Sequence, residues 1–169
     1  MEHLSEVARL LRDCGCSDVV VAAGLLHGVL QDTDVGADEL TARFGAGVCD
    51  LVLAMTDDGV GSYARRKQAF REQVREAGED AVLVLAADEI AEVRELADQV
   101  RRERARGAVA GLPGARDHVQ RYRQMCLEHH RASLAMLRAV APGHLLVRQL
   151  GHELGRVPAM PRSADGATP

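Results

Sequence analysis

The sequence predicts an all-α fold, a single domain of about seven to eight helices. The composition is dominated by Ala, Leu, Val, Arg and Glu, which are mostly strong helix formers, and it contains no Trp and only two Tyr and two Phe. Apolar residues recur at the spacing of a helical face along most of the chain. With 169 residues, the chain is also long enough to bury the core of one domain.

The first two helices are predicted on either side of a Cys-Gly-Cys turn. Residues 4–11 carry the spacing of one helical face. Ser17 or Asp18 can cap the next helix, which runs apolar nearly all round over residues 19–30 and is therefore expected to be central. The β-branched run at 19–21 could indicate a buried strand, but the apolar run has helical length and no partner strand pattern appears elsewhere.

Three shorter helices follow. Residues 31–34 break the apolar pattern, and the helices are then predicted at residues 37–44, 48–55 and 63–77. Gly45 and Gly47 are expected to stop the first of them, and Gly78 the third.

The second half of the chain predicts long helices. Residues 79–106 open with acids and close on arginines, which suits the two ends of a helix dipole, and they are expected to form the longest helix. Two more helices are predicted at 117–140 and 144–154. The expected organisation is a helical core at 1–107, a linker at 108–115, C-terminal helices at 116–155 that pack on the same domain, and a flexible tail at 156–169.

Charge and composition argue against several partners. The net charge is −4 and the 21 basic and 25 acidic residues are intermixed, so no broad positive face is available and nucleic acid is not expected to bind. The longest apolar run is far shorter than the ~20 residues that span a bilayer. Four cysteines without zinc-ribbon or disulfide spacing favour a cytoplasmic protein. The Arg-rich, Lys-poor composition suggests a GC-rich bacterial genome.

Three segments, at residues 2–8, 22–34 and 85–90, carry the candidate chemistry. Taken in this order, they resemble the HD superfamily, specifically the guanosine tetraphosphate hydrolases of the stringent response and their small-alarmone relatives. The resemblance implies an HD-type helical domain in which an early His, a His-Asp doublet and a distant Asp converge on one divalent cation, typically Mn²⁺. Carried over by position, the metal ligands are His3, His27 and Asp88. Side chains held on separate helices can fix such an ion, which activates water and polarises phosphoryl oxygens.

The sequence departs from the family pattern at the same place. The Asp of the doublet is Gly28, which has no side chain, and loss of a ligand is expected to cost at least ~10 to 100-fold in metal affinity, so the metal is expected to bind weakly or not at all. The family's acidic pair that handles the attacking water is Gln31 and Asp32 here. Gln31 cannot act as a base, and Asp32 is expected to be a weak one. Glu89 and Glu92 stand where the family commonly has an Arg and an Asn that meet the nucleotide, and such acids would repel phosphates.

Two other groups have a functional interpretation and a commoner structural one. Arg66 and Lys67 could bind substrate phosphates, although a short charge run on an amphipathic helix is more often a solvated face. His129 and His130 could bind a metal, but neighbouring histidines point to different faces of a helix, and the sequence favours surface positions for both.

Three hypotheses for function remain open. The first is a degenerate HD-domain protein related to metal-dependent guanosine tetraphosphate or nucleotide pyrophosphohydrolases, with catalysis lost or much reduced and a guanine nucleotide as a candidate partner. The second is an active metal-dependent phosphohydrolase acting on a nucleotide pyrophosphate. The third is a helical scaffold that forms a homodimer through residues 117–154, whose stripe of Tyr122, Met125, Leu134 and Leu137 is more commonly explained by core packing.

Overall fold

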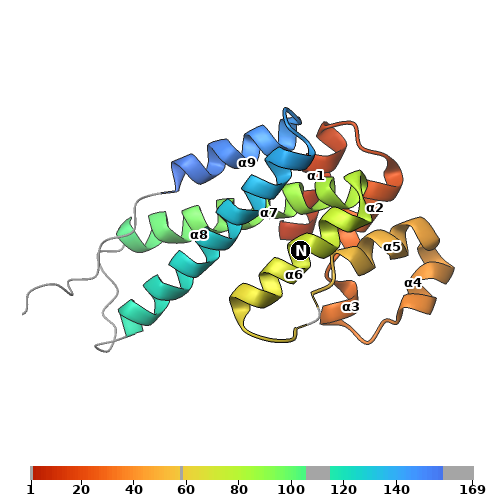
Figure 1. Cartoon of the computed structure of the whole chain (residues 1–169), viewed down its shortest axis with the longest axis horizontal. Helices are drawn as coiled ribbons and strands as arrows, with labels where there is room; N and C mark the ends of the chain where they lie inside the picture. Colours follow the sequence, from red (N-terminus) through yellow and green to blue (C-terminus); the bar gives the residue numbers. More distant parts are fainter. Residues whose placement is uncertain (1, 58, 106–114, 158–169) are drawn as a thin grey trace, which may run out of the picture.

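The structure is a computed structural model that describes residues 2–57, 59–105 and 115–157. Within these ranges it contains eight helices of eight or more residues, one four-residue helix and no strand, which confirms the predicted all-α fold (Figure 1). The helices are α1 (Glu2–Asp13), α2 (Asp18–Leu26), α3 (Val29–Asp32), α4 (Ala37–Phe44), α5 (Ala46–Ala54), α6 (Tyr63–Ala77), α7 (Glu79–Ala105), α8 (Ala115–Val140) and α9 (Leu145–Arg156).

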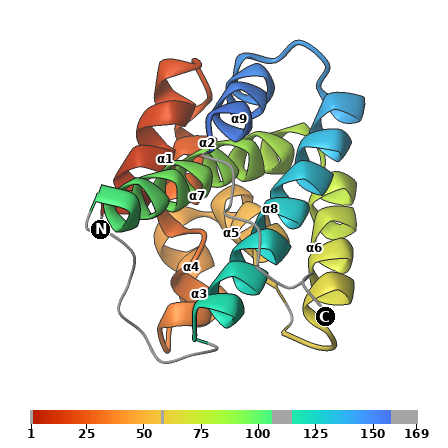
Figure 2. The ribbon, with the colours of Figure 1, turned by 90° about the vertical axis from the view of Figure 1, so that its left-hand side faces the viewer.

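The centre of the fold is α7, the longest helix of the described residues, as the sequence predicted. It packs against α1, α2, α6, α8 and α9, and Figure 2 shows it running between α1 and α2 on one side and α6 and α8 on the other. Ala86, Ala87 and Ala91 are fully buried, because small side chains let neighbouring helices approach the α7 backbone from several sides. Two acidic residues, Asp88 and Glu89, lie inside this buried segment of α7.

The predicted central helix at 19–30 differs from the structure in two ways. It is less buried than expected, because Val19 and Leu25 are 43% and 40% exposed, so α7 rather than α2 is central. It is also interrupted: α2 ends at Leu26, and α3 starts at Val29. The break falls at Gly28, and a glycine weakens a helix interior because its backbone is freer in the unfolded chain. The capping prediction is confirmed for Ser17, whose hydroxyl accepts the Val20 amide at 3.4 Å.

Gly45 ends α4 as predicted, but Gly47 does not stop a helix. Gly45 has φ of 85°, which suits a glycine, and α5 begins at the next residue, so Gly47 lies inside α5. The helix predicted at 48–55 therefore starts two residues earlier and ends one residue earlier, at Ala54. Gly78, with φ of 102°, ends α6 as predicted.

The C-terminal helices pack on the same core. α8 contacts α6, α7 and α9, and α9 contacts α7. Leu134 and Leu137 are buried in this core, which supports the packing interpretation for that part of the predicted stripe, whereas Tyr122 is 55% exposed. Arg94 of α7 joins the N-terminal and C-terminal helices through Glu6 at 2.6 Å and Glu153 at 2.7 Å.

Residues 108–114 of the predicted linker and 158–169 of the predicted tail lie outside the described residues, and the homodimer stays a prediction. Among the described helices, none combines the length and the apolarity needed to cross a membrane.

Candidate metal centre

The three side chains that the resemblance selected meet at one point. His3 comes from the first turn of α1, His27 from the residue that follows α2, and Asp88 from the middle of α7. The Nε2 atoms of His3 and His27 lie 2.9 Å and 3.3 Å from the same oxygen, Oδ1 of Asp88. One ligand atom from each residue falls within 4.8 Å of the others. The structure therefore brings together side chains that are up to 85 residues apart in sequence.

The outward nitrogens of both histidines have acceptors. Nδ1 of His27 donates to the Gly24 carbonyl oxygen at 2.8 Å, and Nδ1 of His3 lies 3.3 Å from Oε1 of Glu95. An acceptor at Nδ1 keeps the proton on that nitrogen in neutral imidazole and leaves the Nε2 lone pair free for a metal, an arrangement common among metal-ligating histidines. Two nitrogens and one carboxylate oxygen, with no fourth side chain among them, fit a divalent first-row cation that keeps open positions.

These three groups form an ionic triad. The hydrogen bond to Asp88 raises the pKa of His3 to about 9, against the opposing effect of burial. Burial lowers the pKa of His27, but the hydrogen bond and charge of Asp88 outweigh it and the net pKa is raised. Burial likewise raises the pKa of Asp88, and the two histidines more than reverse this. Protons on the two Nε2 atoms thus take the place of a cation and compete with it.

Gly28 supplies no ligand, and a nearby carboxylate occupies the space beside it. A Cβ built on Gly28 would lie 2.9 Å from Oδ2 of Asp32, the far end of an exposed side chain. The φ and ψ of Gly28, −91° and −6°, are open to any residue, so a side chain at this position requires only that Asp32 rotate. Gln31 turns elsewhere, and its Nε2 donates to the Asp57 carbonyl oxygen at 3.0 Å.

The two basic residues predicted to bind substrate are paired with an acid. Arg66 Nε and Lys67 Nζ lie 3.2 Å and 3.5 Å from Oδ2 of Asp57. Lys67 is also near Glu92. Burial and the charges of Asp88 and Glu89 raise the pKa of Glu92 to about 7, and the charge of Lys67 acts in the opposite direction. Their role in substrate binding stays a prediction.

A second cluster of the same residue types lies on α7 beside the first, and the sequence prediction for it was wrong. His129 and His130 are buried, at 7% and 4% exposure, rather than on the surface. They enclose Glu89, which is 1% exposed: His129 Nε2 lies 3.2 Å from Oε1, and His130 Nδ1 contacts Oε2. Burial raises the pKa of Glu89, but its contacts with His129 and His130 outweigh burial, so the net pKa is lowered. Glu89 is thus not the phosphate-facing acid that the sequence predicted.

The sequence did contain a signal for this cluster. Glu89 lies among Ala86, Ala87, Ile90 and Ala91, all of them small or apolar and all buried. A carboxylate in such surroundings requires a partner, and the same argument holds for its neighbour Asp88. The sequence could not name the partner because His130 lies 41 residues after Glu89, and no local pattern shows which side chain of α8 meets it.

Comparisons with known proteins show which family the chain resembles. A family model described as "HD domain" matches residues 1–112, more than half of the chain. The human enzyme guanosine-3′,5′-bis(diphosphate) 3′-pyrophosphohydrolase MESH1 is 39% identical over 98 residues, which cover 57% of this chain and 55% of MESH1. The rice protein described as probable chloroplastic GTP diphosphokinase RSH3 is 36% identical over 101 residues, 59% of this chain and 14% of that protein. The chain thus aligns with about half the length of MESH1.

Solved structures show the same fold. The protein lmo0812 of Listeria monocytogenes superposes with a TM-score of 0.69 over 92% of this chain and 94% of that one, at 24% identity. A metazoan ortholog of SpoT, described as hydrolysing ppGpp, superposes with a TM-score of 0.66 over 92% of this chain and 79% of that one, also at 24% identity. The chain therefore belongs to the HD domain family and is related to guanosine-3′,5′-bis(diphosphate) 3′-pyrophosphohydrolases.

Proposed function

We propose that this chain binds a divalent cation through His3, His27 and Asp88 and, with it, the phosphates of a guanine nucleotide such as guanosine tetraphosphate, while hydrolysis is lost or much reduced. The observation that carries the proposal is the convergence of both Nε2 atoms on Oδ1 of Asp88 although residue 28 has no side chain. The nucleotide comes from the relatedness to MESH1, whose name states that substrate.

The chain's own residues prepare this site for a cation. The Gly24 carbonyl accepts from Nδ1 of His27, and the Glu95 carboxylate lies 3.3 Å from Nδ1 of His3; both contacts aim Nε2 at Asp88, so little side-chain entropy is lost when a cation enters. A bound divalent cation supplies Lewis acidity and lowers the pKa of water at the site. Arg66 and Lys67, released from Asp57, are the basic side chains that we assign to the nucleotide phosphates.

The same residues explain why hydrolysis is weak in this proposal. Gly28 removes one anionic ligand, so the cation is held by three side chains. Gln31 donates its amide to the Asp57 carbonyl and has no basic oxygen that could take a proton from water. Asp32 is the one carboxylate left at the two catalytic positions, and its side chain is exposed to solvent rather than held beside the three metal ligands.

The test combines metal binding with hydrolysis. The chain is stripped with chelator and titrated with Mn²⁺, and release of pyrophosphate from guanosine tetraphosphate is followed. We expect the wild type to bind Mn²⁺ with little or no turnover, and Asp88→Asn to weaken Mn²⁺ binding by ~100-fold. Gly28→Asp combined with Gln31→Glu should tighten Mn²⁺ binding by at least ~10-fold and restore turnover.

Two results would overturn the proposal. Mn²⁺ binding that is absent in the wild type, or unaffected by Asp88→Asn, removes the metal site. Fast turnover by the wild type that Asp88→Asn abolishes replaces the proposal with the active phosphohydrolase. His152→Gln, on the exposed face of α9, is the matched control for losing an imidazole away from the site.

A further inference from the structure

We propose that Glu89, His129 and His130 form a second transition-metal site, distinct from the first, which the Arg71 guanidinium closes while no metal is bound. One ligand atom from each of the three residues lies within 4.8 Å of the others. Two imidazoles and one carboxylate suit Zn²⁺, Co²⁺ or another first-row divalent cation rather than Mg²⁺ or Ca²⁺, which prefer oxygen ligands.

An unpartnered atom in the cluster points to a ligand. Oε1 of Glu89 is inaccessible to solvent and accepts no hydrogen bond, although the residue is 1% exposed. The nearest donor atom, Nε2 of His129, lies 3.2 Å away without the alignment of a hydrogen bond. A buried carboxylate oxygen without a hydrogen bond is costly, and a cation placed between Oε1 and the imidazoles would satisfy it.

A fourth ligand is available beside the three. Glu92, one turn after Glu89 on α7, has a carboxylate oxygen 3.8 Å from Nδ1 of His130, and its side chain is 47% exposed. Three buried ligands and one that reaches solvent make up the four-coordinate set that zinc prefers, with Glu92 on the side from which an ion can enter.

Arg71 competes with a cation for this cluster. Its Nη1 lies 2.8 Å from Nδ1 of His129, so the guanidinium donates to that nitrogen. This contact holds the proton of neutral His129 on Nε2, the nitrogen that faces Glu89, and supplies positive charge beside the buried carboxylate. A metal on Nε2 requires the proton to be on Nδ1 instead, and Nδ1 then cannot accept from Arg71.

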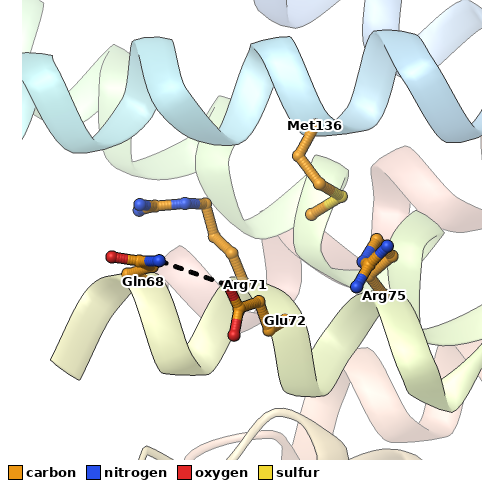
Figure 3. Close-up of a pocket in the computed structure, with 5 residues that line it drawn as sticks. All are labelled: Gln68, Arg71, Glu72, Arg75 and Met136. Atoms are coloured by element: carbon orange, nitrogen blue, oxygen red, sulfur yellow. Dashed lines mark hydrogen bonds between the residues drawn. The ribbon is translucent and has the colours of Figure 1, made fainter. Parts of the chain in front are cut away.

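The structure gives Arg71 a place to move to. Arg71 also lines a pocket of about 350 Å³ between α6 and α8, together with Gln68, Glu72, Arg75 and Met136. Figure 3 shows Arg71 rising from α6 beside this space, with Glu72 next to it on the same helix and Met136 reaching down from α8. A guanidinium that leaves His129 can therefore stay within the pocket close to the Glu72 carboxylate.

The experiment counts metal ions and measures affinity with Co²⁺ alone and Zn²⁺ alone on the full chain. In the His27→Gln/Asp88→Asn variant, which lacks the first site, we expect one bound ion per chain and visible Co²⁺ absorption of a low-symmetry, four-coordinate site. Adding His129→Gln to that variant should remove the ion. If the His27→Gln/Asp88→Asn variant, with wild-type helical content by circular dichroism, binds no ion, the proposal is overturned.

A second measurement is independent of changes to the ligands. Arg71→Gln removes the competing guanidinium and should tighten Co²⁺ binding at this site by ~10-fold, the scale typical of partners that touch metal ligands. Arg75→Gln removes an equal charge from the same pocket, but the guanidinium that contacts His129 is that of Arg71, so Arg75→Gln should leave the affinity unchanged. Equal effects of the two substitutions, or no effect of Arg71→Gln, would also overturn the proposal.

Discussion

The two histidine–carboxylate clusters stand back to back on α7 and differ in how their charge is balanced. Asp88 and Glu89 are consecutive residues, so their side chains leave the helix about 100° apart, one toward α1 and α2 and the other toward α8. The first cluster contains only imidazoles and carboxylates, and both histidines aim Nε2 inward. The second contains a guanidinium whose contact with His129 holds that ring in the opposite tautomer.

Ligand types alone do not define a metal site. Both clusters contain two His and one acid within the same span. What distinguishes them is the group behind each imidazole: a carbonyl and a carboxylate in the first, and an arginine in the second. Acceptors behind the rings favour a metal, whereas a donor favours the metal-free ion network.

Removing the central acid should separate the clusters most clearly. Glu89→Gln removes the buried carboxylate that balances the charges of Arg71 and His130. We therefore expect the free energy of unfolding of the metal-free chain to fall by ~3 kcal/mol. Urea denaturation in the presence of chelator measures it. Glu95→Gln is the control from the first cluster: its side chain is 62% exposed, and its loss should cost less than ~1 kcal/mol. Equal losses of unfolding free energy in the two variants would contradict a difference in charge balance between the two clusters.

A smaller effect is expected where α1 and α2 touch. A Cβ on Gly24 would lie 2.5 Å from Cδ1 of Leu11 and 3.2 Å from Cγ1 of Val7, so Gly24→Ala must push α1 away from α2. We expect a loss of ~1–3 kcal/mol in unfolding free energy. Weaker Mn²⁺ binding should accompany it, because His3 and His27 move apart.

The control for this prediction is Gly155→Ala in α9, whose added Cβ would meet no atom within 4 Å. It should leave Mn²⁺ binding unchanged and stabilise the helix slightly. Wild-type stability and Mn²⁺ affinity in Gly24→Ala would show that the close approach of α1 and α2 does not set the geometry of the first cluster.

The smallest effect expected is a pH dependence. The pKa of His3 is about 9 in the folded chain and has an ordinary value of 6.5, so its contribution to stability is complete below pH 6.5 and is lost as the pH rises through 9. The Tm of the chelator-treated chain should therefore fall by several degrees over this range. His27 and His130, whose pKa values are also raised, add to the same trend.

His3→Gln should flatten part of this profile, whereas His152→Gln should not. A wild-type Tm that is constant between pH 6.5 and 9, or a profile unchanged in His3→Gln, would show that Asp88 does not hold His3 in its protonated form.

Several features of this protein were determined by the sequence alone. The spacing of apolar residues gave the all-α class and the helix at 63–77, because helical periodicity and glycine stops are local properties. The order of three segments indicated the HD family and the three residues of the first cluster. A family pattern can identify residues that meet in the fold although they are far apart in sequence, which local chemistry cannot do.

Tertiary packing alone decided the rest. The central position of α7 and the burial of His129 and His130 depend on which helices meet, and no local pattern specifies that. The charge balance of the second cluster depends on Arg71, which lies 58 residues before His129. Whether a histidine accepts or donates is set by its neighbour in space, and only the folded chain brings that neighbour to it.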